Sequence, residues 1–418
     1  HRIQDCWNRP INSAPGARID VMERVSRDGN CTLEVTGKST SCLNLGSYNY
    51  LGFADDWVNT CGDTVLETVR QWPIATCASK ADLGTTALHR ELERVVAEFV
   101  GMEDAVVFTM GYGTNATTLP VLMGPGSLII SDSLNHTSLV NGSRSTSAMI
   151  RVFPHNEPEK LEAVLREAVV KGQPKHHRPW RKILVVVEGI YSMEGAVCRL
   201  AEVVAICKKY KAYVYVDEAH SIGALGLTGR GICEHTGIKP SEIDVLMGTF
   251  TKSFGGMGGY IAGSRALCER LRSTSAGQLY HQVMAPVVCQ QVITALKVIS
   301  GELCPGYGAE KLTRLRDNSN FFRSEMHRIG LHVYGDADSP IIPVMIYCPA
   351  KIAAFSRECL KRGLAIVVVG FPATGVILSR ARFCISAGHT REDLEKAVEI
   401  LDEVTDLLLL KYDRRFYG

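Results

Sequence analysis

The feature that most constrains the fold of this sequence is an alternation of short apolar runs with longer helical stretches. Thr86 to Val100 has apolar residues at helical spacing, which predicts an amphipathic helix. Short apolar runs follow at 105–108, 128–130, 149–153, 183–187, 214–216 and 245–247. Strands that alternate with helices predict an α/β fold, with a mostly parallel sheet covered by helices on both faces.

The pattern changes after Tyr260, where helical periodicity dominates. Expected helices cover 264–275, 284–299, 311–329, 351–362 and 391–410, and expected strands cover 341–346, 366–369 and 381–385. The first 50 residues contain prolines and glycines and are expected to be irregular. We therefore expect an irregular N-terminal segment (1–60), a large domain (61–290) and a smaller α+β C-terminal domain (291–418).

Composition limits the possible functions. The chain has 418 residues, is 46% hydrophobic and carries a formal net charge of +2, so it can bury a large core and predicts no basic surface for nucleic acid. The fourteen cysteines include no Cys-x-x-Cys pair, which predicts reduced thiols and no metal site. No apolar run reaches the roughly 18 to 20 residues of a membrane helix. Because the chain begins with His1, we expect it to be a fragment whose missing N-terminus can carry a membrane anchor.

The strongest chemical signal is Lys252, which lies between hydroxyl residues and glycines in the stretch Gly248 to Tyr260. A partly desolvated lysine can form a Schiff base with a carbonyl cofactor, although a lysine in such a loop is often simply solvated. Upstream, an apolar strand ends at Asp217, with His220 three residues later. A carboxylate at that sheet edge can keep the ring nitrogen of pyridoxal phosphate protonated, and His220 can reach the ring hydroxyl. Taken alone, Asp217 also fits a helix cap.

Two strand-to-helix turns add candidate residues. Gly111 and Tyr112 follow a predicted strand and open a helix, where free N–H groups can hold a phosphate. His136 follows the next strand and can stack on a planar cofactor, although a lone histidine there is also common as a structural hydrogen-bonding residue. Near the C-terminus, Arg380 and Arg382 start a predicted strand, and arginine can bind a carboxylate through two parallel hydrogen bonds.

Read together, these stretches resemble the α-oxoamine synthases, pyridoxal-phosphate enzymes of fold type I that join an amino acid to an acyl-CoA with loss of carbon dioxide. The resemblance covers nearly the whole chain. It is carried by the motifs at 48–53, 188–195, 217–221, 248–255 and 367–374. The lysine stretch and Phe371-Pro372-Ala373-Thr374 are similar to the branch that condenses L-serine with palmitoyl-CoA to 3-ketodihydrosphingosine, the first step of sphingolipid biosynthesis.

The resemblance implies a role for each matching residue. Lys252 would carry the cofactor as a Schiff base and act as the base that removes the α-proton of serine. Asp217 would pair with the pyridine nitrogen of the cofactor. His220 would donate a hydrogen bond to the ring oxygen, and His136 would stack on the ring. The remaining implied contacts are Thr249, Gly111, Tyr112 and Ser192 toward the cofactor, and Arg382, Arg380 and Tyr50 toward the substrate. The resemblance also implies a heterodimer with a homologous chain that lacks the lysine, at the endoplasmic reticulum membrane with the catalytic body facing the cytosol.

One region departs from the family pattern, and three alternatives stay open. Where the family has Cys-Ser-Thr-Arg this chain has Cys77-Ala78-Ser79-Lys80, so a bidentate contact at Lys80 is in doubt. Residues 83–89 and 273–286 also differ, and relatives often bring partner residues to the cofactor at the second of these. The alternatives are a sister enzyme that uses glycine and a short acyl-CoA, a non-catalytic subunit and a plain aminotransferase. The presence of Lys252 disfavours the second, and the motif contexts disfavour the third.

Overall fold

The computed structural model describes residues 3–412, which divide into two compact units. The large unit comprises residues 58–191 and 197–309. The small unit comprises the residues up to 57, the segment 192–196 and the residues from 310 onward. Each unit is described separately below.

The large unit is built on a seven-stranded sheet in the order β3-β9-β8-β7-β6-β4-β5. Its strands are β3 (Asp104–Phe108), β4 (Leu128–Asp132), β5 (Met149–Phe153), β6 (Ile183–Glu188), β7 (Tyr213–Asp217), β8 (Val245–Thr249) and β9 (Gly259–Gly263). All neighbouring strands are parallel except β9, which runs antiparallel to both β3 and β8. The expected mostly parallel sheet is therefore confirmed, and β9 is a strand that the sequence pattern did not predict.

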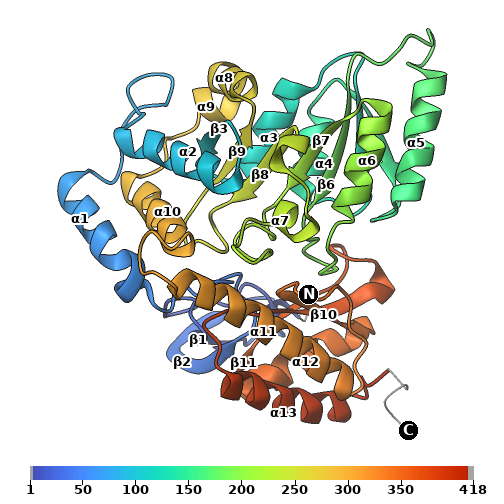
Figure 1. Ribbon diagram of the computed structural model, residues 1–418. Helices are drawn as coiled ribbons and strands as arrows, with labels where there is room; N and C mark the ends of the chain where they lie inside the picture. The colour runs from blue at the N-terminus through green and yellow to red at the C-terminus, as the bar shows by residue number, and fades with distance from the viewer. Residues whose placement is uncertain (1–2, 413–418) are drawn as a thin grey trace. The chain divides into compact units, whose positions relative to one another are not determined.

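Helices cover this sheet or, like α1, pack on another helix, as Figure 1 shows. They are α1 (Asp63–Gln71), α2 (Ala87–Val100), α3 (Gly111–Leu122), α4 (Thr137–Arg144), α5 (Pro158–Lys171), α6 (Leu200–Tyr210), α7 (Ile232–Thr236), α8 (Arg265–Thr274), α9 (Ala276–Leu279) and α10 (Pro286–Ile299). Helix α3 packs on β3, β8 and β9, and α6 packs on β7. Leu119 of α3, Leu139 of α4 and Leu271 of α8 are fully buried in one apolar cluster with side chains of the central strands. This burial fixes the start of α3 close to the end of β8.

The small unit contains two three-stranded sheets, β10-β13-β12 and β1-β2-β11. Their strands are β10 (Ile341–Tyr347), β12 (Val367–Val369), β13 (Ser379–Cys384), β1 (Arg18–Val25), β2 (Glu34–Asn44) and β11 (Leu364–Ala365). The helices are α11 (Tyr307–Arg328), whose first three residues belong to the large unit, α12 (Pro349–Lys361) and α13 (Arg391–Leu407). The expectation of an irregular N-terminal segment was wrong, because β1 and β2 form an antiparallel pair there. The sequence did not predict β2 because most of that strand is exposed and polar, so it has no apolar run, and because it contains Gly37.

Within residues 3–412, no helix is both long and apolar enough to cross a membrane. The same residues contain no group of three His, Cys, Asp or Glu side chains placed to hold a metal ion.

Candidate active site

A cavity of about 220 Å³ opens in the large unit where β6, β7 and β8 end. Its lining residues are Gly111, Tyr112, Asn115, His136, Ser138, Glu188, Asp217, Ala219, His220, Met247, Thr249, Thr251 and Lys252. Seven of these were predicted from the sequence: Lys252, Asp217, His220, His136, Thr249, Gly111 and Tyr112. The parallel strands bring them together because their carboxyl ends meet at one edge of the sheet.

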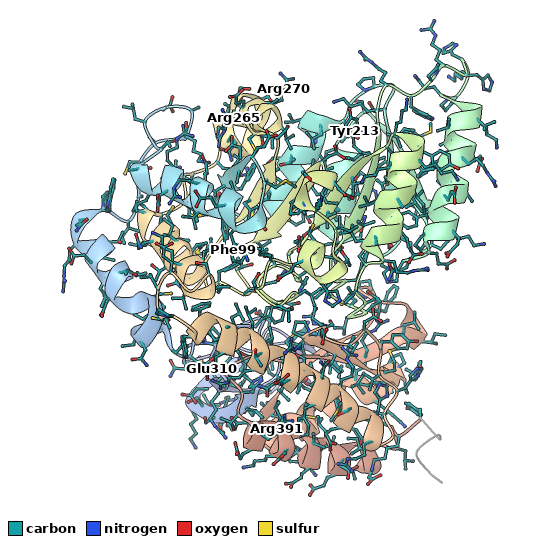
Figure 2. The ribbon with its side chains drawn as sticks, in the orientation of Figure 1. Phe99, Tyr213, Arg265, Arg270, Glu310 and Arg391 are labelled. Carbon is teal, nitrogen blue, oxygen red and sulfur yellow. The ribbon has the colours of Figure 1, made fainter. Side chains whose placement is uncertain are left out.

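Asp217 is the buried anionic group of this cavity. Strand β7 runs from Tyr213, which is labelled in Figure 2, to Asp217, whose residue is only 4% exposed. One carboxylate oxygen accepts the side-chain amide of Asn115 at 2.7 Å, and the other accepts the backbone N–H of Ala219 at 2.9 Å. Asn115 is held in turn by the hydroxyl of Tyr215, which donates to its carbonyl oxygen at 2.6 Å. These bonds fix the orientation of the carboxylate.

His136 lies at the N-cap of α4, with its side chain exposed at the cavity. Its Nδ1 accepts the backbone N–H of Ser138 at 3.2 Å and lies 2.7 Å from the Ser138 hydroxyl oxygen. Desolvation lowers the pKa of the imidazole. Because a backbone amide can only donate, Nδ1 is the acceptor and the neutral ring carries its proton on Nε2. The ring is therefore held by one edge in a fixed orientation.

Lys252 lies three residues beyond the end of β8, in a stretch anchored by aromatic rings. Phe250 and Phe254 are both fully buried, and their rings meet edge-on at 6.2 Å. Phe254 also meets Phe99 of α2, labelled in Figure 2, at 6.5 Å. Ser253 donates its hydroxyl to the carbonyl of Ile222 at 2.7 Å. Apolar anchors on both sides of Lys252 thus fix the half-buried lysine at the cavity.

The N-terminus of α3 supplies free backbone donors at the cavity wall. A Cβ at Gly111 would lie 2.9 Å from Cγ2 of Thr249, so glycine permits the helix start to approach the end of β8. Tyr112 follows, and its hydroxyl accepts the side-chain amide of Asn141 at 2.7 Å. The first N–H groups of a helix attract anions, as a phosphate requires.

Six lining residues were not predicted, and three of them bond through their side chains to predicted residues of the cavity: Asn115, Ser138 and Glu188. The side-chain amide of Asn115 donates to the Ser138 hydroxyl at 2.9 Å as well as to Asp217, so the chain of contacts extends to His136. Asn115 and Ser138 lie inside helices, and neither belongs to a sequence motif that would predict a functional role. Glu188 carried a signal that was not used, since it ends an apolar strand beside β7, as Asp217 ends β7.

The other predicted residues belong to the small unit. Arg382 is 6% exposed, and its guanidinium lies 4.8 Å from the centre of the Tyr48 ring. Arg380 is bonded to the carbonyl of Met193 at 2.8 Å and to Glu194 at 3.2 Å. Tyr50 is fully buried, and burial raises its pKa well above the usual value. Ser192 belongs to the short segment 192–196 of this unit. Their roles toward a substrate or cofactor stay predictions.

The residues at the cavity fit pyridoxal phosphate. A fixed carboxylate that could face a ring nitrogen, a lysine that could bind an aldehyde carbon and a helix N-terminus that could hold a phosphate all line the same space. The imidazole of His136 adds a planar group that can lie against a ring.

Comparisons with known proteins agree with this geometry. The model of the family described as aminotransferase class I and II matches residues 40–401. Long chain base biosynthesis protein 2b of Arabidopsis thaliana is 58% identical over 412 residues, which cover 99% of this chain and 84% of that protein. Serine palmitoyltransferase 3 of Homo sapiens is 48% identical over 414 residues, covering 99% and 75%. A solved structure described as SPT with a PLP internal aldimine superposes with a TM-score of 0.85 at 27% identity, covering 98% of this chain and 94% of that one.

The fold is therefore that of the pyridoxal-phosphate-dependent transferases of fold type I, as the sequence predicted. The chain belongs to the aminotransferase class I and II family and, within it, to the group that includes these long chain base biosynthesis and serine palmitoyltransferase proteins.

Proposed function

We propose that this chain is the catalytic chain of a serine palmitoyltransferase, a pyridoxal-phosphate-dependent acyltransferase. It would condense L-serine with palmitoyl-CoA to 3-ketodihydrosphingosine, releasing carbon dioxide and coenzyme A. The observation that carries the proposal is that Lys252 and Asp217 line one cavity in a chain 48–58% identical to proteins of this name and pathway. A subunit without catalytic function would have no use for that pair.

The side chains at the cavity and on β13 would each have a separate role in binding the cofactor, binding the substrate or transferring a proton. When bound, the cofactor withdraws electrons from the α-carbon of the amino acid. Asp217 would stabilise the proton on the ring nitrogen, and Lys252 would attach the cofactor and then take the α-proton. His136 would pack on the ring, while His220 would donate to its oxygen. Thr249 and the start of α3 would hold the phosphate, and Arg382 would receive the serine carboxylate.

Assembly and location are part of the proposal. We propose a heterodimer with a homologous chain lacking the lysine, at the endoplasmic reticulum membrane with the catalytic body facing the cytosol. The resemblance of the sequence supports both statements. Co-expression with such a chain, followed by light scattering of the purified complex, tests the first. Cell fractionation of the full-length protein tests the second.

Borohydride trapping tests the cofactor and the lysine together. We expect the purified chain, alone or with its partner, to show a visible absorption band after addition of pyridoxal phosphate. Reduction should fix the cofactor to the peptide that contains Lys252, as mass spectrometry would show. Lys252→Ala should fold, as judged by circular dichroism, yet carry no fixed cofactor and lose activity. Turnover by the folded variant would refute the assignment.

The amino-acid substrate needs a separate measurement. L-serine should shift the absorption band of the wild-type chain, and glycine should leave it nearly unchanged. The reverse result would favour a glycine-using sister enzyme. Absence of any band and of any trapped lysine would favour a non-catalytic subunit.

A further inference from the structure

Glu188 is a buried carboxyl group at the cavity that the proposed reaction does not use. It is the last residue of β6, and its register partner on the neighbouring strand is Asp217, the last residue of β7. Figure 1 shows these two strands side by side in the centre of the sheet. Glu188 lines the cavity and is 4% exposed. Two carboxyl groups thus end adjacent strands at one cavity.

The contacts of Glu188 differ from those of Asp217. Its Oε1 accepts the backbone N–H of His136, while its own N–H donates to the hydroxyl of Tyr191 at 3.2 Å. His136 caps α4, and its imidazole bonds Ser138 at that helix start. Because Glu188 bonds to the backbone N–H of His136, it fixes the position of the main chain from which the imidazole extends. The bonds to Ser138 then set how the ring is turned.

The protonation of Glu188 supports a role other than that of a second anion. Burial, and secondly the charge of Asp217, raise its pKa well above the usual value. Burial therefore favours the neutral acid, whose carbonyl oxygen can still accept the His136 amide. Glutamine has the same length and likewise combines a carbonyl oxygen that accepts with a neutral group that donates.

We propose that Glu188 is a positioning residue whose carboxyl accepts the His136 backbone N–H and thereby holds the imidazole at the place of the cofactor ring. The inference rests on the proposed function, because it assigns His136 to pyridoxal phosphate. On this proposal, the length of the Glu188 side chain, here called its reach, and not its charge, determines whether His136 is held in place.

Two conservative variants separate reach from charge. Glu188→Gln keeps the length and the acceptor but removes the acid. Glu188→Asp keeps the acid but withdraws it by one methylene group, beyond contact with the His136 amide. The proposal predicts that glutamine replaces Glu188 and aspartate does not, whereas a role that needs the carboxylate charge predicts the opposite order.

The first readout needs no cofactor. Hydrogen exchange of the His136 amide, followed in the cofactor-free chain, should be as slow in Glu188→Gln as in wild type. In Glu188→Asp it should be about tenfold faster, the factor expected for one lost buried hydrogen bond. Equal exchange in both variants would refute the contact, whatever the chain catalyses.

The second readout is binding of pyridoxal phosphate, measured by fluorescence titration together with the induced circular dichroism of the bound cofactor. We expect affinity within about twofold of wild type for Glu188→Gln and about tenfold weaker binding, with a reduced dichroic band, for Glu188→Asp. Weaker binding by the glutamine variant than by the aspartate variant would overturn the proposal. A wild-type chain that binds no cofactor would contradict the proposed function, while the exchange result for Glu188 would still stand.

Glu218 is the matched control. It is also fully buried, with a pKa raised to about 7 by burial, but its carboxylate accepts from Ser221 and from the N–H of Ile232 and does not line the cavity. Glu218→Gln and Glu218→Asp should change thermal stability without changing exchange of the His136 amide. A change in that exchange as large as in Glu188→Asp would mean that any buried glutamate at these strand ends produces the effect.

Discussion

At the scale of the residue, two arginines of β13 are both buried but have different partners. Arg380 and Arg382 lie two positions apart on one strand, and both are more than 90% buried. Arg380 is neutralised by Glu194, its ion-pair partner. Arg382 lies over the face of the Tyr48 ring and donates from Nη1 to the sulfur of Met193 at 3.8 Å, but it has no ion pair and its Nε has no hydrogen-bond partner among residues 3–412. A buried guanidinium with an unused donor is suited to receive a carboxylate from a substrate.

This difference predicts different effects for the same substitution. Arg382→Lys keeps the charge but loses the two-pronged geometry, so we expect the KM for L-serine to rise by about tenfold or more. Arg380→Lys can keep its ion pair with Glu194, so we expect a KM within about threefold of wild type. Steady-state kinetics with varied serine at saturating palmitoyl-CoA measure both. Equal increases for the two variants would contradict the assignment of the carboxylate to Arg382.

At this scale the sequence predicted residues whose types suit cofactor chemistry and which line the cavity, but it missed residues that bond to them. Lys252 and Asp217 were found because a lysine among glycines and an acid at a strand end are informative by type and position. Asn115 was missed because its importance comes from meeting Asp217, 102 positions away in sequence. No local pattern encodes a contact of that kind.

At the scale of the element, one buried carboxylate connects α2, β3, α8 and the loop before α2. Glu93 of α2 is 4% exposed and pairs with Lys80 at 2.8 Å and with Arg272 of α8 at 3.1 Å. Lys80 also donates to the carbonyl of Val107 in β3 at 3.1 Å. Burial acts to raise the pKa of Glu93, but the neighbouring cations outweigh it and the pKa is lowered. Lys80, where the family has arginine, thus has a defined structural partner.

Removal of that carboxylate should destabilise the large unit. Glu93→Ala leaves Lys80, Arg272 and the more exposed Arg90 without their shared carboxylate, which costs about 3 to 5 kcal/mol of unfolding free energy. Glu91→Ala, two residues earlier on the same helix, removes only the partly exposed pairs with Arg94 and Lys297 and should cost less than about 1 kcal/mol. Urea unfolding of both variants gives the comparison, and similar losses would contradict the importance of the cluster.

Periodicity predicted elements well where one side is buried. Each predicted strand of the large unit was found within two residues of its expected ends. For β3, β4, β6, β7 and β8 the continuous apolar run marks a mostly buried strand, whereas the edge strand β5 is largely exposed or half-buried. Strand β9, Gly259–Gly263, has the sequence GYIAG and follows a glycine run, so its pattern is that of a loop. A Cβ at Gly259 would lie 2.6 Å from the carbonyl oxygen of Gly248 in β8, so the close approach of β9 to β8 requires glycine. The same glycine makes the sequence of β9 look like a loop.

At the scale of the whole molecule, each unit contains a buried histidine that joins distant segments. In the large unit His89 contacts the carbonyl of Met284 through Nε2 at 2.8 Å. In the small unit His389 contacts the carbonyl of Asn44 at 2.8 Å, and its Nδ1 accepts the N–H of Ser386 at 3.1 Å. Burial lowers the pKa of both imidazoles below the usual 6.5. Both rings are therefore neutral in the folded chain near pH 7.

These lowered pKa values make both units sensitive to mild acid. Below pH 6.5 the histidines of the unfolded chain become protonated, whereas His89 and His389 of the folded chain stay neutral. The free energy of unfolding therefore falls as the pH decreases toward the pKa that these histidines have in the folded chain. The slope is at most about 1.4 kcal/mol per pH unit for each histidine. We expect His389→Gln to flatten this slope in the small unit only, and His89→Gln in the large unit only.

Hydrogen exchange between pH 7.5 and 5.5, corrected for the intrinsic pH dependence of exchange, separates the two units because each peptide belongs to one of them. Both variants should start less stable than wild type at pH 7.5, since the imidazole contacts are lost, yet lose less on acidification. If His389→Gln flattened the slope in peptides of both units, the units would unfold together, and the histidines would act on a single cooperative structure. An unchanged slope in every peptide would mean that other groups determine the acid sensitivity of the chain.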